Sequence, residues 1–217
     1  MPSILFKDNH LLMVEKPVNL SAQTVEGGDS LPHRLKELGY PVKPVHRLDK
    51  PTGGVMIYAR SDQAAAKLSA IVSQHDVFQK EYFAVVQGCP DNAEGTLIDL
   101  LYHDVRKNKS YVVNRPRKGV REAKLDYSVV KTATTDEGIF SLVRVRLHTG
   151  RTHQIRVQFA SRKMPLYGDS RYGGVKGKAL GLWSHQLTLP HPITGNTLSA
   201  ESNPNWDSAP WCYFKET

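Results

Sequence analysis

The 217-residue sequence has few cysteines and no long apolar run, and both absences exclude classes of protein. Cys89 and Cys212 are its only thiols, too few for a disulfide framework or a four-ligand zinc site, and this favours a reducing compartment. A membrane-spanning helix needs roughly eighteen or more consecutive apolar residues, and an export signal needs an apolar stretch near the N-terminus. Neither occurs, so we expect a cytoplasmic protein without a membrane partner.

The sequence also lacks the common cofactor-binding motifs. It has neither the glycine fingerprint of dinucleotide-binding folds nor the Gly-Lys-Ser/Thr pattern of a phosphate loop, and 173–178 is only a stretch rich in Gly and Lys. No Cys or carboxylate accompanies His148, His153, His185 or His191 at the spacing of metal ligands. We therefore predict neither a cofactor nor a metal ion.

Acidic residues are missing from one long stretch of the chain. No Asp or Glu lies between Glu137 and Asp169, whereas several cations do. These are Arg144, Arg146, Arg151, Arg156, Arg162 and Lys163. A similar excess of Lys and Arg occurs in residues 106–131, and the net charge is +8. For most of these residues taken singly, a solvated surface is the commoner role. Together they favour a polyanionic partner such as nucleic acid, because Lys and Arg neutralise phosphates.

One carboxylate stands among cations. Asp49 is the only acid in residues 38–61, and His46, Arg47 and Lys50 are close to it in sequence. Nearby positive charge favours the ionised form of a carboxyl group. Such a group is suited to act as a nucleophile or an electrostatic partner, and less suited to donate a proton. The alternative is that Asp49 only caps the turn before the following proline.

The hydrophobic pattern alternates between short strands and a few helices. Strands are predicted at 11–16, 55–59, 80–87, 123–132, 139–147, 183–189 and 197–200. Helices are predicted from a cap at Asp29 or Ser30 through Leu38, from Ser61 to near His75, and within 153–162. This order predicts an α+β fold with a mixed, mostly antiparallel central β-sheet flanked by helices and loops. We expect residues 1–217 to form one domain.

Several short motifs follow one another in a fixed order. They are His46-Arg47-Leu48-Asp49 with Pro51-Thr52-Gly53-Gly54, then Lys80-Glu81-Tyr82, then Thr149 to Val157 (TGRTHQIRV), then Pro165-Leu166-Tyr167-Gly168-Asp169 with Tyr172-Gly173. In this order and spacing the sequence closely resembles the RluA-type RNA pseudouridine synthases, from Glu15-Lys16-Pro17 to His191-Pro192. The resemblance implies the pseudouridine synthase fold and an isomerase. Such an enzyme breaks the N1 to C1′ bond of a uridine in rRNA or tRNA and rejoins the base through C5.

The resemblance also implies a catalytic set. Asp49 corresponds to the catalytic carboxylate, Tyr82 to the active-site tyrosine, and Arg156 to the arginine that pairs with this carboxylate. Asp49 could bond the sugar or act as a base on it, and the sequence leaves both open. Tyr82 could stack on the base and take part in proton transfer at C5, although a tyrosine on a strand often only packs in a core. Gly53 and Gly54 are predicted to permit close backbone approach.

RNA binding is expected from the basic residues near these motifs. Arg47 could fill the gap left by a flipped-out nucleotide, contact a phosphate or form a structural ion pair. The full candidate set is Arg47, His46, Arg151, His153, Arg144 and Arg146. Family members often carry an N-terminal S4 domain, whereas here the catalytic pattern begins almost at Met1. We therefore expect a single catalytic domain without an S4 domain. We also expect the protein to act as a monomer.

Two other functions remain open from the sequence. One is a catalytically inactive RNA-binding protein of the same fold. The other is a glycoside hydrolase, which needs a second carboxylate about 5 to 9.5 Å from the first. Glu81 and Asp169 are the candidates for that second carboxylate.

Overall fold

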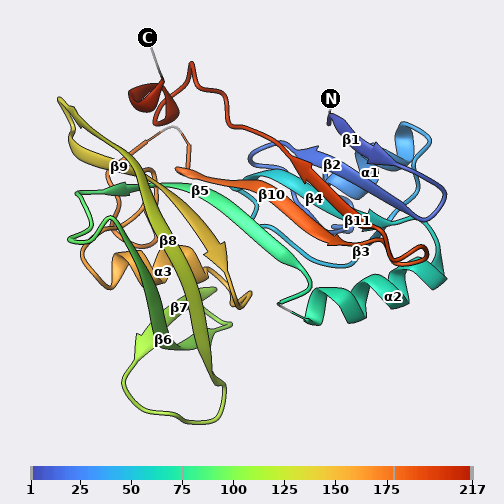
Figure 1. The fold of residues 1–217 in the computed structure, drawn as a ribbon, viewed down its shortest axis with the longest axis horizontal. Coiled ribbons are helices and arrows are strands. Elements are labelled where there is room, and N and C mark those ends of the chain that lie inside the picture. The colour runs from blue at the N-terminus through green and yellow to red at the C-terminus, as the bar shows by residue number, and fades with distance from the viewer. Residues whose placement is uncertain (1, 75, 178, 216–217) are drawn as a thin grey trace. The chain divides into compact units, whose positions relative to one another are not determined.

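The chain forms two compact units in the computed structural model (Figure 1), which describes residues 2–74, 76–177 and 179–215. Unit 1 comprises residues 1–80 and 183–204, and unit 2 comprises residues 81–182 and 205–217. His75, where a predicted helix was expected to end, and Lys178, at the end of the stretch rich in Gly and Lys, lie outside the described residues.

Unit 1 is built on a mixed sheet. Its strands run in the order β1 (Ile4–Lys7), β2 (Leu11–Lys16), β4 (Gly53–Ala59) and β10 (Leu182–Pro190), with β3 (Lys43–Pro44) paired to β4 and β11 (Thr197–Glu201) paired to β10. β2 and β4 are antiparallel, whereas β4 and β10 are parallel. Every residue of β4 is buried, which explains why this strand reads as a continuous apolar run.

Two helices accompany this sheet. α1 (Leu31–Glu37) begins after Ser30, whose side chain accepts a hydrogen bond from the backbone of the first turn, as predicted. α2 (Asp62–Ser73) begins after Ser61, which caps it in the same way. The buried face of α2, with Leu68 at its centre, packs against apolar residues of β2, β4 and β10. The predicted helical spacing therefore corresponds to a real core contact.

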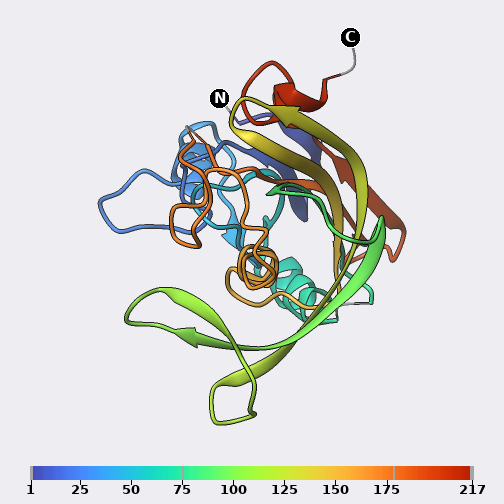
Figure 2. The same cartoon turned by 90° about the vertical axis from the view of Figure 1, so that its left-hand side faces the viewer.

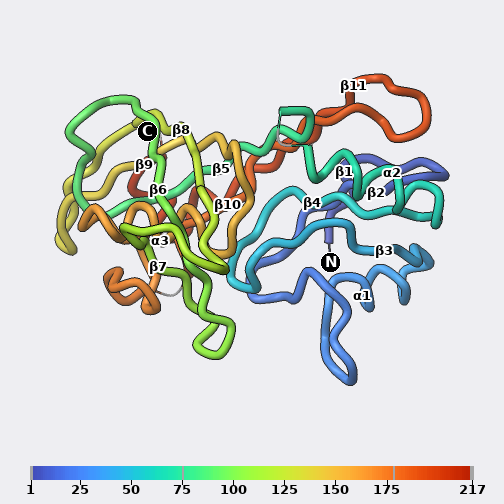
Figure 3. The backbone as a smooth tube through the Cα atoms, turned by 90° about the horizontal axis from the view of Figure 1, so that it is seen from below, coloured from blue at the N-terminus to red at the C-terminus, as the bar shows by residue number. Residues whose placement is uncertain are grey.

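Unit 2 is an antiparallel sheet with one short α-helix. Its strands run in the order β5 (Gln79–Gln87), β9 (Gly138–Leu147), β8 (Val120–Thr135), β6 (Glu94–Asp104) and β7 (Lys109–Val113). α3 (Gln154–Ala160) lies against β6 and β7 (Figure 3), and a 3₁₀ turn, η1 (Trp211–Phe214), follows near the C-terminus. In Figure 2 the β6–β7 hairpin and the loop from β7 to β8, in green to yellow-green, extend from the rest of this unit.

The predicted α+β fold with a mixed, mostly antiparallel sheet is confirmed, but several elements were missed. The prediction omitted β1, β3, β6, β7 and η1, and it placed β8 too short at 123–132. β6 and most of β8 are partly exposed without a regular alternation, so neither gives the period-two pattern on which strand prediction depends. The short helix predicted within 153–162 is α3, which begins at Gln154 because His153, at a φ of 56°, is its N-cap.

Two glycines allow β4 and β10 to lie side by side. Gly53 and Gly54 pair with Trp183 and Ser184. A Cβ on Gly54 would lie 2.1 Å from the carbonyl oxygen of Ser184, and the φ of Gly54 is +111°. The predicted close approach of backbone at these glycines is therefore present, and it occurs directly after the Asp49 loop.

We expect Gly54→Ala to destabilise the protein by at least about 3 kcal/mol, because it combines a left-handed backbone with a clash against main-chain atoms. Gly138→Ala is the matched control. Its φ is +123°, but a Cβ there would meet nothing within 4 Å. Backbone strain alone should cost about 1 to 2 kcal/mol there. Urea denaturation measures the free energy of unfolding of both variants. Equal losses of stability would show that the close approach of Ser184 to Gly54 is unimportant.

Candidate active site

Asp49 lies in unit 1, in the loop between β3 and β4, and is partly buried. Its carbonyl oxygen accepts a hydrogen bond of 3.0 Å from the backbone N–H of Thr52, which closes a turn, and the preceding Leu48 is buried. The turn at Pro51, which Asp49 would cap if it had only a structural role, is thus present. It also fixes the backbone from which the carboxylate projects.

A buried lysine secures the same loop. Lys16, at the end of β2, is fully buried, and its Nζ donates hydrogen bonds to the carbonyl oxygens of Pro17, Leu20 and Lys50 at 2.8, 2.8 and 3.1 Å. Burial lowers the pKa of Lys16 to about 8, although the negative charge of Asp49 acts in the opposite direction. The ammonium therefore ties the residue after Asp49 to the sheet.

Sequence reasoning assigned no role to Lys16. Its only signal was the Glu15-Lys16-Pro17 motif, which marked the start of the resemblance but gave no indication that the side chain is buried.

His46 and Arg47 precede Asp49 and differ in their surroundings. Nε2 of His46 accepts a hydrogen bond of 3.1 Å from the backbone N–H of Ile57, and its ring packs edge-on against Phe78. Burial and the charge of Lys80 lower the pKa of His46 to about 3, so the imidazole is neutral and carries its proton on Nδ1. Arg47 is exposed at the surface.

Tyr82 and Arg156 lie in unit 2, on β5 and α3, and both are buried. Arg156 forms a bidentate ion pair with Asp169: its Nε and Nη2 donate to the two carboxylate oxygens at 2.7 and 2.8 Å. The side chains are 7% and 1% exposed, so the pair is shielded from water. This partner was not predicted: the resemblance paired Arg156 with Asp49, and Asp169 was named only within a motif and as a possible second acid of a hydrolase.

The remaining RNA-binding candidates lie in unit 2. Arg144 and Arg146 are exposed on β9. Nε of Arg144 is 4.0 Å from Oε2 of Glu81, and its guanidinium lies over the ring of Phe83. Nε of Arg151 donates to the carbonyl oxygen of Glu122 at 2.8 Å. His153 is only 8% exposed. The structure therefore places three arginines at or near the surface and the histidine inside.

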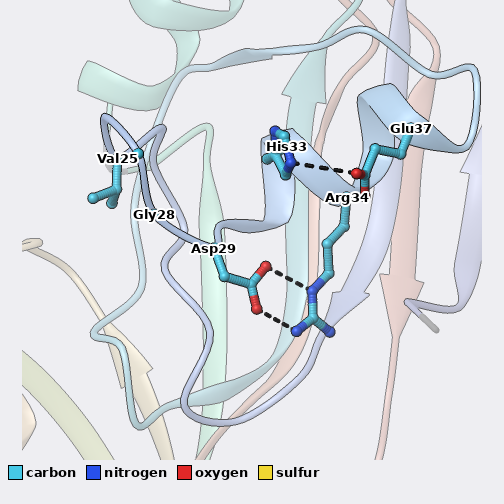
Figure 4. Close-up of a pocket in the computed structure, with 7 residues that line it drawn as sticks. Val25, Gly28, Asp29, His33, Arg34 and Glu37 are labelled. Atoms are coloured by element: carbon cyan, nitrogen blue, oxygen red, sulfur yellow. Dashed lines mark hydrogen bonds and ion pairs between the residues drawn. The ribbon is translucent and has the colours of Figure 1, made fainter.

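A hollow of about 550 Å³ lies beside α1 in unit 1 (Figure 4). Arg34 on its wall forms an ion pair with Asp29, and Nε2 of His33 lies 3.4 Å from Oε1 of Glu37. Because the charges that line this hollow pair with one another, we place the candidate site at the motif residues and not here. No helix in the part of the chain that the structure describes is long and apolar enough to cross a membrane.

The fold is similar to solved structures of human proteins. The chain matches human RNA pseudouridylate synthase domain containing 1 with a TM-score of 0.82 and 20% identity, covering 95% of this chain and 84% of that one. It matches human RNA pseudouridylate synthase domain containing 4 with a TM-score of 0.75 and 23% identity, covering 94% of this chain and 89% of that one. At this identity the likeness establishes the fold.

Sequence relatives establish the family. Residues 10–161 match the family model described as RNA pseudouridylate synthase. The chain is 32% identical to dual-specificity RNA pseudouridine synthase RluA of Haemophilus influenzae and to that of Escherichia coli, over 90% of each chain. It is 30% identical to the uncharacterized RNA pseudouridine synthase YhcT of Bacillus subtilis, over 92% of this chain and 67% of the relative. The chain therefore belongs to the RluA-type RNA pseudouridine synthases, isomerases that act on RNA.

Proposed function

We propose that Asp49, Tyr82 and Arg156 form one active site, that the two units act together as a single catalytic domain, and that the substrate is a specific uridine of rRNA or tRNA. The observation that carries this proposal is the anchoring of Asp49. A fully buried ammonium, that of Lys16, holds the loop of Asp49, and the two charges attract each other. A loop built in this way presents a carboxylate in a fixed position, as catalysis requires.

The chemistry follows from the groups available. The carboxylate of Asp49 either attacks C1′ or removes a proton from the sugar, and in both cases the N1 to C1′ bond breaks. The detached base turns and forms a bond from C5 to C1′. This bond displaces the carboxylate of Asp49 from C1′ in the first case, and in the second case Asp49 returns the proton to the sugar. The proton on C5 then leaves and N1 gains a proton, so the product is an isomer of the substrate. The phenol of Tyr82 is the proposed stacking surface and a participant in this proton transfer. Arg156 orients the carboxylate of Asp49.

The ion pair of Asp169 argues against a glycoside hydrolase. Both oxygens of this carboxylate accept hydrogen bonds from Arg156, and the side chain is almost fully buried. A second catalytic carboxylate has to reach either a water molecule or the leaving group. Asp169 is committed to Arg156 and is poorly placed for that task.

Tritium release separates isomerisation from hydrolysis. RNA transcripts that carry 5-tritiated uridine are incubated with the protein, and the solvent and the RNA are both analysed. We expect tritium to appear in the solvent while pseudouridine accumulates in the RNA in equal amount. Free uracil in place of pseudouridine would contradict the proposal, and so would the absence of both products with total tRNA and rRNA as substrates.

We further propose that RNA is held by Arg47, His46, Arg151, His153, Arg144 and Arg146, with the two histidines shaping the surface on which the arginines lie. The excess of cations supports this, as do the exposed positions of Arg47, Arg144 and Arg146. Cytoplasmic rRNA or tRNA is then the natural partner of a monomer that carries a net charge of +8.

RNA affinity should depend steeply on salt. For about four phosphate contacts, we expect it to fall roughly 50-fold between about 50 and 200 mM monovalent salt. The double variant Arg144→Gln/Arg146→Gln should reduce the slope of log affinity against log salt by about 1 to 2. Lys215→Gln, which removes an exposed lysine paired with Asp207, is the control. Fluorescence anisotropy measures the slopes, and a flat dependence for the wild type would contradict an electrostatic grip.

A further inference from the structure

Tyr172 lies at the junction of α3 with the β6–β7 hairpin in unit 2. The centroid of its ring is 5.2 Å from Cζ of Arg156 and 5.2 Å from Nζ of Lys109, the first residue of β7. The face of an aromatic ring attracts a cation within about 6 Å of its centroid. One ring therefore contacts both the proposed catalytic arginine and a cation of the hairpin.

The hydroxyl group of Tyr172 fixes the position of this ring. It accepts a hydrogen bond of 2.8 Å from the backbone N–H of Ser110, and it lies 2.9 Å from Nδ1 of His153. Burial raises the pKa of the Tyr172 phenol, although the hydrogen bond from Ser110 and the charge of Arg156 act in the opposite direction. The phenol is thus neutral at physiological pH. Displacement of the ring from its place beside Arg156 would therefore break both hydrogen bonds.

Ser110 in turn attaches the hairpin to the start of α3. Its hydroxyl donates to the carbonyl oxygen of Thr152 at 2.6 Å, and Nδ1 of His103 on β6 is 3.2 Å from the same hydroxyl. Because the single hydroxyl proton of Ser110 goes to Thr152, His103 must be the donor in the second bond. Ser110 is only 2% exposed, so water does not compete for these bonds.

A second connection reaches the turn of the hairpin. Nη1 of Arg171, the residue before Tyr172, donates to the carbonyl oxygens of Lys107 and Asn108 at 2.9 Å each. On the other side, the backbone N–H of Tyr172 donates to the carbonyl oxygen of Asp169, whose side chain holds Arg156. The segment 169–172 therefore connects the basic turn of the hairpin to the catalytic arginine.

We propose that Tyr172 is a positioning residue that fixes the guanidinium of Arg156 and couples it to the basic turn of the β6–β7 hairpin. This inference rests on the proposed role of Arg156 in catalysis. RNA phosphates bound at the turn, where Arg106 and Lys107 are exposed, would then stabilise the orientation of Arg156 that the reaction needs. Binding energy at the hairpin is thereby used at the reacting centre.

Two substitutions of Tyr172 separate its ring from its hydroxyl. Tyr172→Leu removes both, and we expect the single-turnover rate at saturating RNA to fall about 30-fold, since small misplacements of a catalytic group can cost up to about 100-fold. Tyr172→Phe keeps the ring over Arg156 and should lose only about 3- to 10-fold. RNA affinity should stay within about threefold for both variants. A merely structural role would lower stability without this ordered loss of rate.

A double-mutant cycle tests whether Tyr172 acts through Arg156. In an Arg156→Lys background, Tyr172→Leu should lower the rate by no more than about threefold. An undiminished 30-fold loss in that background would overturn the inference. If Tyr172→Leu fails to fold, Tyr172→Phe is measured in both backgrounds, and equal losses overturn the inference in the same way.

The control for this cycle is Tyr111→Leu, which removes a half-buried tyrosine of the same hairpin that Lys109 also covers. We expect its rate to stay within about twofold of the wild type. A 30-fold loss there would mean that any tyrosine of the hairpin matters and would overturn the specific role of Tyr172. A wild-type protein that forms no pseudouridine, or an Arg156→Lys protein as fast as the wild type, would instead contradict the proposed function.

Discussion

Asp49→Asn should reduce the rate of pseudouridine formation by at least about a thousandfold, because the amide can neither bond C1′ nor accept a proton from the sugar. The side chains have nearly the same shape, so the turn closed by Thr52 should persist and the protein should fold. RNA affinity should change by less than about threefold, since the substitution removes a negative charge and leaves every cation in place. The rate is measured by tritium release under single-turnover conditions.

The matched control is Asp91→Asn, which makes the same chemical change at an exposed position in unit 2. It should leave the rate within about twofold. A rate for Asp49→Asn within tenfold of the wild type would remove this carboxylate from the catalytic set. The pKa of Lys16 provides an independent check, because the charge of Asp49 raises it against the effect of burial. Loss of the negative charge of Asp49 should lower the pKa of Lys16 below about 8. Titration of isotopically labelled lysine by NMR can detect this change.

Arg156→Met should lose at least about a hundredfold in rate and also about 3 to 5 kcal/mol in stability. The stability loss arises because Asp169 would remain buried without the two hydrogen bonds that it now accepts. Low activity in this variant alone would therefore not distinguish a catalytic arginine from a structural one. Urea denaturation and single-turnover rates are both required.

The double variant Arg156→Met/Asp169→Asn makes this distinction. Removing the uncompensated charge of Asp169 should recover at least about 1 to 2 kcal/mol of the lost stability. The rate should stay at the level of Arg156→Met, since the missing group is still absent. Recovery of rate together with stability would show that Arg156 only supports the fold. Asp169→Asn alone should be the most active of the three variants, because it keeps the guanidinium.

Much of the fold and the family could be predicted from the sequence, because both depend on local patterns. The strand 11–16 and the caps at Ser30 and Ser61 agree with the structure, since short-range periodicity and capping chemistry decide them. The ordered motifs predicted an RNA pseudouridine synthase, and the comparisons confirm the family. The roles of Asp49, Tyr82 and Arg156 stay predictions, and the substitutions described above test those of Asp49 and Arg156.

The interactions around these residues could not be predicted, because they join segments that are far apart in sequence. Ser110 and Tyr172 are separated by 62 positions, and nothing in the sequence near either residue indicates the other. The burial of Lys16 was missed for a related reason: a lysine at the end of a strand is ordinarily solvated, and only the assembled loops supply its three carbonyl acceptors. The β6–β7 hairpin was missed because most of its residues are partly exposed, without a regular alternation of buried and exposed side chains.

The division of the chain has a consequence for the order in which the protein can fold during synthesis. Unit 1 takes its first segment from residues 1–80 and its second from 183–204, so the whole first segment of unit 2 is translated between them. Leu187 and Leu189 of β10 belong to the same core cluster as Val55 and Ile57 of β4. A nascent chain that ends before β10 leaves that core incomplete, whereas β5 to β9 of unit 2 are already present. On the ribosome, unit 2 can therefore begin to fold before unit 1, although unit 1 contains the N-terminus.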